Sequence, residues 1–205
     1  MMVEAITLLK KQLNDYVTQV DGSGPGAPLQ IVLGNVAQLD RQDVATELDN
    51  HLVLSLVNLE EERTLKNGRA AVNAGPGDVV YRNPPVHLNL YLLFAANYRN
   101  YETALKRLAQ VLTFFQGKNK FTLANSPGSF PLQSAITEFS LAMDLVSLTF
   151  EQVNHLWGFL GAKEVPFALY RGRLISISDQ RVLEGGGRIR DIELTSRDIS
   201  GGVAA

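Results

Sequence analysis

The sequence has 205 residues, of which 45% are hydrophobic and 20% charged, and its formal net charge at pH 7 is −2. This composition is typical of a globular domain, and the small net charge argues against strong overall attraction to nucleic acid or to an anionic membrane. The sequence contains no cysteine, which excludes disulfides, zinc thiolate sites and cysteine nucleophiles within it. We expect neither a signal peptide nor a membrane span, because the densest apolar stretch, residues 88–96, is only as long as a strand.

The first third of the chain is expected to form one helix and two strands. Apolar residues recur at helical spacing over residues 2–20, which predicts an amphipathic helix. A loop rich in glycine and proline follows at residues 22–28, and residues 29–33 are expected to form a strand. Residues 51–63 predict a second strand with two largely apolar faces, so this strand is either central in its sheet or covered on its second side.

The segment from residue 83 to residue 115 is the most informative part of the sequence. It follows a turn-rich loop at residues 73–78, and the pair Pro84-Pro85 blocks a helix and begins a strand. One face of this strand is apolar, whereas the other face is mixed and carries His87 and Tyr91. We therefore take these two residues as candidate interface residues.

A helix over residues 101–116 is expected directly after this strand. Asn100 is placed to cap it, and Gly117 is a natural end. The apolar stripe of this helix lasts about two heptads, which favours packing on the preceding sheet over a coiled coil. This stripe, which we expect to be buried, consists of Tyr101, Leu105, Leu108, Leu112 and Phe115.

The loop from Gly117 to Pro131 is long enough to suggest a purpose. It carries Lys118 and Lys120, which we take as candidate interface residues, although solvated surface charge is the alternative interpretation. Residues 133–143 are expected to form a strand after this loop, with Phe139, Leu141 and Met143 on one side.

A capping box formed by Thr149 and Gln152 predicts a further helix over residues 150–160, ending at Gly161. Its expected buried stripe consists of Phe150, Val153, Trp157 and Leu160. Trp157 could instead anchor an interface, but its place in the stripe favours the core. Residues 167–177 are expected to form the last strand of the main domain.

The composition changes near the C-terminus. We predict one domain over residues 1–178 and a hinge with a C-terminal arm over residues 179–205, with the hinge at Gly185-Gly186-Gly187. The segment 188–194 alternates weakly, like a strand, and its candidate interface residues are Arg188, Ile189, Ile192 and Leu194. The predicted fold class is α+β, with a mainly antiparallel sheet flanked by about three helices and a flexible C-terminal arm.

Little in the sequence supports a catalytic or metal-binding role. His51, His87 and His155 lie on three separate predicted elements, without a second ligand at helical or strand spacing. The glycine-rich stretches do not fit a phosphate-binding loop, and no Gly-x-Ser-x-Gly motif is present. We therefore expect no enzyme activity, no metal and no cofactor, although a triad assembled from distant residues would escape this inspection.

Several motifs resemble those of the tail-terminator, or tube-cap, proteins of phage-tail-like contractile injection systems. They comprise Arg82-Asn-Pro-Pro-Val-His-Leu-Asn-Leu-Tyr-Leu-Leu-Phe94, Asn100-Tyr-Glu-Thr-Ala-Leu105 with Phe114-Phe-Gln116, and Leu148-Thr-Phe-Glu-Gln-Val-Asn-His-Leu-Trp157, which leads to Leu169-Tyr-Arg171. The resemblance covers roughly residues 1–178, and the motifs are fairly specific only when they are taken together.

This resemblance implies a structural protein without enzyme activity or cofactor. It implies a homohexameric ring on the distal end of the inner tube, with the tube protein, the sheath protein and in some arrangements a further cap protein as partners. It implies synthesis in the bacterial cytoplasm and leaves open whether the particle is cytoplasmic, membrane-docked or released. The alternative function is an adaptor or baseplate-like assembly module of the same kind of particle.

Overall fold

The computed structural model describes residues 2–22, 30–39, 47–62, 71–75, 78–81, 86–122, 124–126, 139–177 and 184–187. The chain divides into two compact units, which are described separately. The first unit comprises Met1–Lys66 and Pro85–Ile177, and the second comprises Asn67–Pro84 and Ser178–Ala205.

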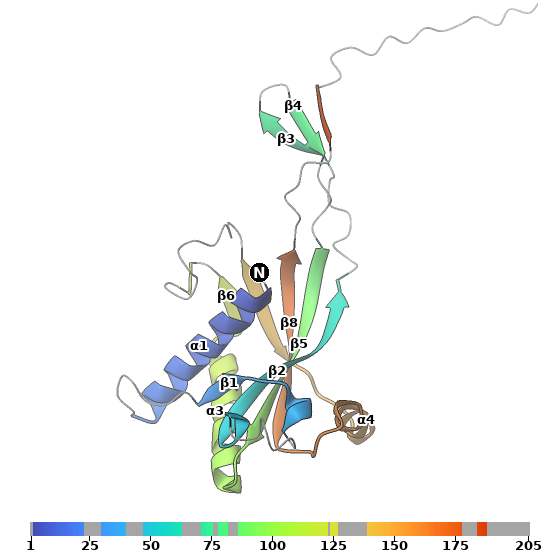
Figure 1. The fold of residues 1–205 in the computed structure, drawn as a ribbon. Coiled ribbons are helices and arrows are strands. Elements are labelled where there is room, and N and C mark those ends of the chain that lie inside the picture. Colours follow the sequence, from blue (N-terminus) through green and yellow to red (C-terminus); the bar gives the residue numbers. More distant parts are fainter. Residues whose placement is uncertain are drawn as a thin grey trace, which may run out of the picture. The chain divides into compact units, whose positions relative to one another are not determined.

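The described part of the first unit holds helices on both sides of one sheet (Figure 1). Its helices are α1 (Met2–Val20), the short 3-10 helix η1 (Val36–Gln38), α3 (Tyr101–Gly117) and α4 (Phe150–Leu160). Its strands are β1 (Ile31–Leu33), β2 (His51–Glu61), β5 (Val86–Asn97), β6 (Lys120–Thr122), β7 (Ser140–Leu145) and β8 (Phe167–Ile177). The strand order is β1-β2-β5-β8-β7-β6, and only the β1–β2 pair is parallel. This architecture confirms the predicted α+β class with a mainly antiparallel sheet.

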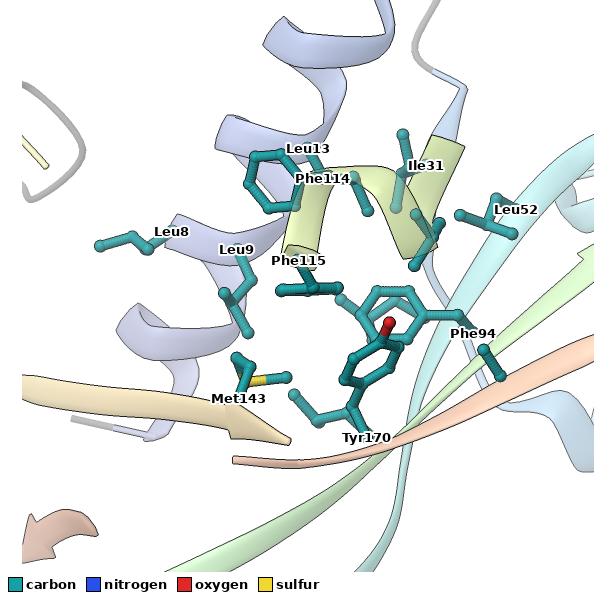
Figure 2. Packing of buried hydrophobic residues seen from close by; sticks show 14 of the residues in the cluster. Leu8, Leu9, Leu13, Ile31, Leu52, Phe94, Phe114, Phe115, Met143 and Tyr170 are labelled. Carbon is teal, nitrogen blue, oxygen red and sulfur yellow. The ribbon is translucent and has the colours of Figure 1, made fainter. Parts of the chain in front are cut away.

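The first face of the sheet carries the larger core, which α1 and α3 cover (Figure 1). Figure 2 shows Leu9 of α1 and Phe115 of α3 facing the strands that carry Met143 and Tyr170. The rings of Phe94 and Phe115 lie edge to face with centroids 5.5 Å apart, and Tyr170 lies 4.5 Å from Phe115. Such aromatic contacts add to the stabilisation from burial, so this face holds the fold together.

The buried face of α3 differs from the predicted one. Both Phe114 and Phe115 enter the core, and two adjacent residues can do so only if the buried arc of the helix is centred between them. The helix is therefore rotated relative to the expected stripe, of which Phe115 is buried and Leu108 half-buried. The other three residues of that stripe are exposed: Tyr101 by 64%, Leu105 by 45% and Leu112 by 39%.

The second face of the sheet carries a smaller core beneath α4. Trp157 is buried there, as expected, with its ring centroid 5.5 Å from that of Phe167. The predicted capping box at Thr149 is confirmed, and Gly161 ends the helix at a φ of 65° that favours glycine. Phe150 was expected in the buried stripe but is 97% exposed, because it occupies the first helical position, before the turn that contacts the sheet.

Asn14 joins α1 to the outer edge of β1. Its Oδ1 accepts hydrogen bonds from the backbone N–H groups of Gln30 and Ile31, at 2.9 and 3.1 Å. Its Nδ2 donates to the carbonyl of Ile31 at 3.0 Å and to that of Lys10 at 3.0 Å. The side-chain amide thus replaces a neighbouring strand and satisfies an edge that would otherwise be left unpaired.

Asp21 joins the end of α1 to α3. Its carboxylate accepts hydrogen bonds from Arg107 and from Gln110, the latter at 3.0 Å, and Lys106 forms an ion pair with it at 3.0 Å. Burial alone would raise the pKa of this carboxyl, but the hydrogen bonds from Arg107, Lys106 and Gln110 outweigh it and lower the pKa to about 2. The pair α1–α3 is therefore held by charge at one end and by apolar packing along its length.

Two predicted segments near β7 need correction. The strand expected over residues 133–143 begins at Ser140 in the structure, and residues 133–138 lie outside the described residues. Its predicted buried side is confirmed, since Phe139, Leu141 and Met143 are all buried. The expected loop 117–131 contains β6, which pairs with β7 because Phe121 fills the first core.

The second unit contains a three-stranded antiparallel sheet. Its strands are β3 (Ala71–Gly75), β4 (Asp78–Tyr81) and β9 (Glu184–Gly187), in the order β3-β4-β9. The sequence suggested a loop at residues 73–78, but residues 73–75 belong to β3 and residue 78 to β4. The glycines of the predicted hinge at residues 185–187 lie in β9, and the division at residue 178 stays a prediction. Residues 188–205 of the predicted arm lie outside the described residues.

Candidate functional site

An apolar ridge lies on the exposed side of α3. We define this ridge as Tyr101, Leu105 and Leu112, which recur at helical spacing, together with the 54% exposed Leu145 of β7. Leu112 and Leu145 line a pocket together with Phe115 and Tyr170 of the first core. Exposed apolar groups that adjoin a pocket are typical of surfaces that bind another protein.

A polar belt crosses the second face of the sheet, next to the core beneath α4. We define it by Glu60 on β2, Asn89 and Tyr91 on β5, and Arg171 on β8. The register places Glu60 opposite Asn89, and Tyr91 opposite Arg171. The Tyr91 hydroxyl donates to Glu60 Oε2 at 2.7 Å, and the Asn89 amide donates to Glu62 Oε2 at 3.1 Å.

Two polar atoms of this belt are buried without a hydrogen-bond partner: Asn89 Oδ1 and Arg171 Nε. Asn89 is only 3% exposed, and together with Arg171 and the carboxylates of Glu60 and Glu62 it lines a pocket. The hydrogen bond to Glu60 raises the pKa of Tyr91, and burial raises it further. Tyr91 therefore remains a neutral donor, while the pocket retains one acceptor and one donor that a partner could satisfy.

A second, more apolar pocket lies where the belt meets α4. Val57 of β2 and Tyr91 of β5 line it on the sheet, and Leu156 and the 83% exposed Phe159 line it on α4. Apolar and acidic side chains thus lie next to each other along the second half of β2. Such a surface suits a partner segment with basic side chains at one end and apolar side chains at the other.

The structure places the predicted interface residues in different settings. Tyr91 lies in the belt, and His87 is half-buried two residues before Asn89 on the same strand. The Lys118 ammonium donates to Gln12 Oε1 and to the Asn125 carbonyl, each at 2.8 Å, and lies 5.0 Å from the centre of the Phe121 ring.

Lys120 is exposed on β6, whereas Arg188, Ile189, Ile192 and Leu194 lie outside the described residues.

Sequence reasoning missed Glu60, Asn89 and Arg171 as a group. Only the pairing of β2, β5 and β8 brings the three side chains together. The alternation of residues 86–94, which placed Asn89 on the same side as Tyr91, was the available signal.

The described ranges of the chain lack two further features, a metal site and a membrane-spanning helix. Within those ranges no group of three or more His, Asp or Glu side chains could hold a metal ion. No helix of that part of the structure has the length and apolarity needed to cross a membrane.

Two solved structures have a fold similar to this chain. One is the sheath/tube terminator of PVC, an extracellular contractile injection system, in its extended state; it has a TM-score of 0.56 at 14% identity, with 99% of this chain and 65% of that chain covered. The other is the tube-terminating cap of the anti-feeding prophage; it has a TM-score of 0.55 at 15% identity, with 96% of this chain and 62% of that chain covered. The chain therefore spans somewhat less than two thirds of the length of each of these proteins.

No curated protein matches this chain. Residues 4–191, in contrast, match the family described as the Pvc16 N-terminal domain. This match runs past the end of β8 and includes β9, so the family domain contains segments from both compact units. Because the match covers most of the sequence, the chain belongs to the Pvc16 N-terminal domain family.

Proposed function

We propose that this protein is a structural cap that forms a ring on the distal end of the inner tube and sheath of a contractile injection particle. The cap ends polymerisation and anchors the sheath. The observation that carries this proposal is the family match over residues 4–191, supported by the similarity of the fold to a sheath/tube terminator and to a tube-terminating cap. The proposal assigns no catalytic step and no cofactor.

The surfaces of the first unit are suited to such a role. Rings stacked head to tail leave an unsatisfied face at each end of the filament, and a cap must complement one of these faces without offering another. The α3 ridge is an apolar surface of the kind that an assembly covers. We infer that ring closure or contact with the particle covers this ridge.

The stoichiometry and the partners belong to the same proposal. We propose a homohexamer that contacts the tube protein on one side and the sheath protein on the other, within a particle made in a bacterial cytoplasm. Of the two lysines, the exposed Lys120 is the better candidate for contact with the tube, because the Lys118 ammonium is bonded within its own chain. His87, Tyr91 and the segment 188–194 remain proposed contacts with neighbouring subunits or sheath.

The test is the length distribution of assembled particles, measured by electron microscopy with and without this protein. We expect missing, detached or abnormally long tubes in its absence, and restoration when the full-length chain is added back. Particles of normal length with the sheath attached would contradict the cap function and favour the alternative, an adaptor or baseplate-like module.

A matched pair of variants refines this experiment. Leu105→Ser with Leu112→Ser removes apolar surface from the ridge, whereas Glu102→Gln with Thr113→Ser changes exposed residues of α3 outside it. We expect the first pair to fail in restoring particle length while still folding, and the second pair to restore it. Equal restoration by both pairs would show that the ridge has no part in assembly.

A further inference from the structure

Among the described strands, only β1 lies beside β2 on the side away from β5. β1 pairs with β2 only at Leu52–Leu54, and η1 covers the next residue, since the Val36 N–H donates to Ser55 Oγ at 2.9 Å. From Leu56 to Glu61 no described strand pairs with that side. Leu56 and Leu59 are 37% and 46% exposed, so apolar side chains at this edge are available to those of an added strand.

The two ends of this edge differ in chemistry. On the second face of the sheet, Glu60 lies opposite Asn89, whose buried Oδ1 lacks a hydrogen-bond donor. Farther back along the strand, Val57 lines the apolar pocket together with Leu156 and Phe159. An added strand would therefore need basic donors beside Glu60 and apolar side chains beside Val57.

Residues 188–194, Arg-Ile-Arg-Asp-Ile-Glu-Leu, carry this pattern on one side of a strand. Alternate residues share a side, which groups Arg188 and Arg190 with Ile192 and Leu194. If the segment pairs with β2 as an antiparallel strand, Arg190 can lie opposite Glu60 and Ile192 opposite Asn58. Leu194 then lies near Val57 and the apolar pocket.

The carboxylates at this end of β2 also disfavour one competing partner for the edge, namely the β2 edge of a second copy. In a parallel pair of such edges in register, the run Glu60-Glu61-Glu62 would face carboxylates of its own kind, and like charges across a strand pair are destabilising. The register shift between Leu56 and Asn58 also limits unselective pairing, because a bulge twists the edge. A basic segment avoids this repulsion between like charges and is instead attracted by the carboxylates.

We propose that residues 188–194 of a second copy of this chain add an antiparallel strand to the edge formed by Leu56–Glu61. The choice of a second copy rests on the proposed function, because a head-to-tail ring lets every subunit donate one segment and accept one. The exchange closes the β2 edge in every subunit and links neighbours through backbone hydrogen bonds. It also supplies a donor, from Arg188 or Arg190, for Asn89 Oδ1.

Cysteine cross-linking tests the proposal directly, because the natural sequence has no cysteine. Two differently tagged full-length chains are prepared, one with Asn58→Cys and the other with Ile192→Cys, then mixed and oxidised. We expect a disulfide-linked dimer that contains both tags. The matched control replaces Ile192→Cys with Ile189→Cys, which lies on the opposite side of the strand and should cross-link at least about tenfold less.

Three results would overturn the proposal. The first is equal cross-linking of the Ile192→Cys and Ile189→Cys chains to the Asn58→Cys chain, which indicates random collision. The second is cross-linking only within a chain that carries both Asn58→Cys and Ile192→Cys, which assigns the segment to its own subunit. The third is a full-length chain that sediments as a monomer at every concentration and shows no mixed dimer.

Charge reversal provides a second measurement that does not depend on disulfide geometry. Arg190→Glu should weaken self-association in sedimentation, by about tenfold if one close ion pair is lost and one repulsive pair is made. Mixing it with a Glu60→Arg chain should restore the mixed dimer. A loss that Glu60→Arg does not restore would count against the proposed register.

Particle length separates this proposal from the cap function. If the chains do not cross-link but particle length is normal, the cap function stands and the strand exchange is excluded. If the chains cross-link but the protein has no effect on particle length, the strand exchange stands and the cap function is excluded.

Discussion

The two faces of the six-stranded sheet differ in how the described helices cover them. Two helices of 19 and 17 residues cover the first face and bury an aromatic cluster. One helix of 11 residues covers part of the second face, and the polar belt and the open β2 edge lie beside it. We infer that the first face provides most of the stability. Partners then meet the outer side of α3, which carries the ridge, and the partly uncovered second face of the sheet itself.

The largest expected effect is on the first face. Phe94 is fully buried, and Phe94→Ala should lower the free energy of unfolding by about 3–5 kcal/mol because it removes a large side chain from a packed core. The measurement is urea-induced unfolding. The control is Phe150→Ala, which should change stability by less than about 0.5 kcal/mol because that ring is 97% exposed. Similar losses for the two variants would contradict the comparison.

Asn14→Ala should have the next largest effect. It leaves the N–H and carbonyl of Ile31 unsatisfied at the edge of β1, and we expect a loss of roughly 2–3 kcal/mol in the free energy of unfolding. Hydrogen exchange of the Ile31 amide should also become faster. Asn154→Ala on the exposed side of α4 is the matched control and should be nearly neutral. An unchanged Ile31 exchange rate would show that the amide does not hold this edge.

The Asp21 cluster predicts a dependence of stability on acid pH. The folded-state pKa of about 2 lies below the ordinary value of 3.8, so the ionised carboxylate stabilises the folded chain at pH values above about 4. This contribution, about 2 kcal/mol, is lost as the pH falls through 4 toward 2. Unfolding measured between pH 6 and about pH 2 should show this loss in the natural protein and a flatter profile in Asp21→Asn. Parallel profiles for the two proteins would exclude a role for Asp21.

The sequence was sufficient for those features that depend on neighbouring residues. The caps at Asn100 and Thr149, the αL glycine after α4 and the alternation of β5 were each predicted and confirmed. These features depend on hydrogen bonds and side-chain directions within a few residues, which the local pattern encodes.

The features that depend on contacts between distant segments were not predicted. The rotation of α3 depends on how Phe114 and Phe115 share the space around Phe94 and Tyr170, which the helical period alone does not determine. β9 depends on pairing with β4, about a hundred residues earlier, and its glycines give no alternating signal. The polar belt was missed for the same reason, because Glu60, Tyr91 and Arg171 become neighbours only when β2, β5 and β8 pair.

The smallest expected effect is on the second face, and it sharpens the comparison most. Tyr91→Phe removes the hydroxyl that donates to Glu60 at 2.7 Å, in an exposed setting where water can replace it, so the free energy of unfolding should fall by only about 0.5 kcal/mol. Self-association, measured by sedimentation of the full-length chain, should change more than stability does, because Tyr91 orients the carboxylate that we propose to meet Arg190. Stability lost in step with association would instead make the belt part of the fold, and the functional distinction between the two faces would no longer hold.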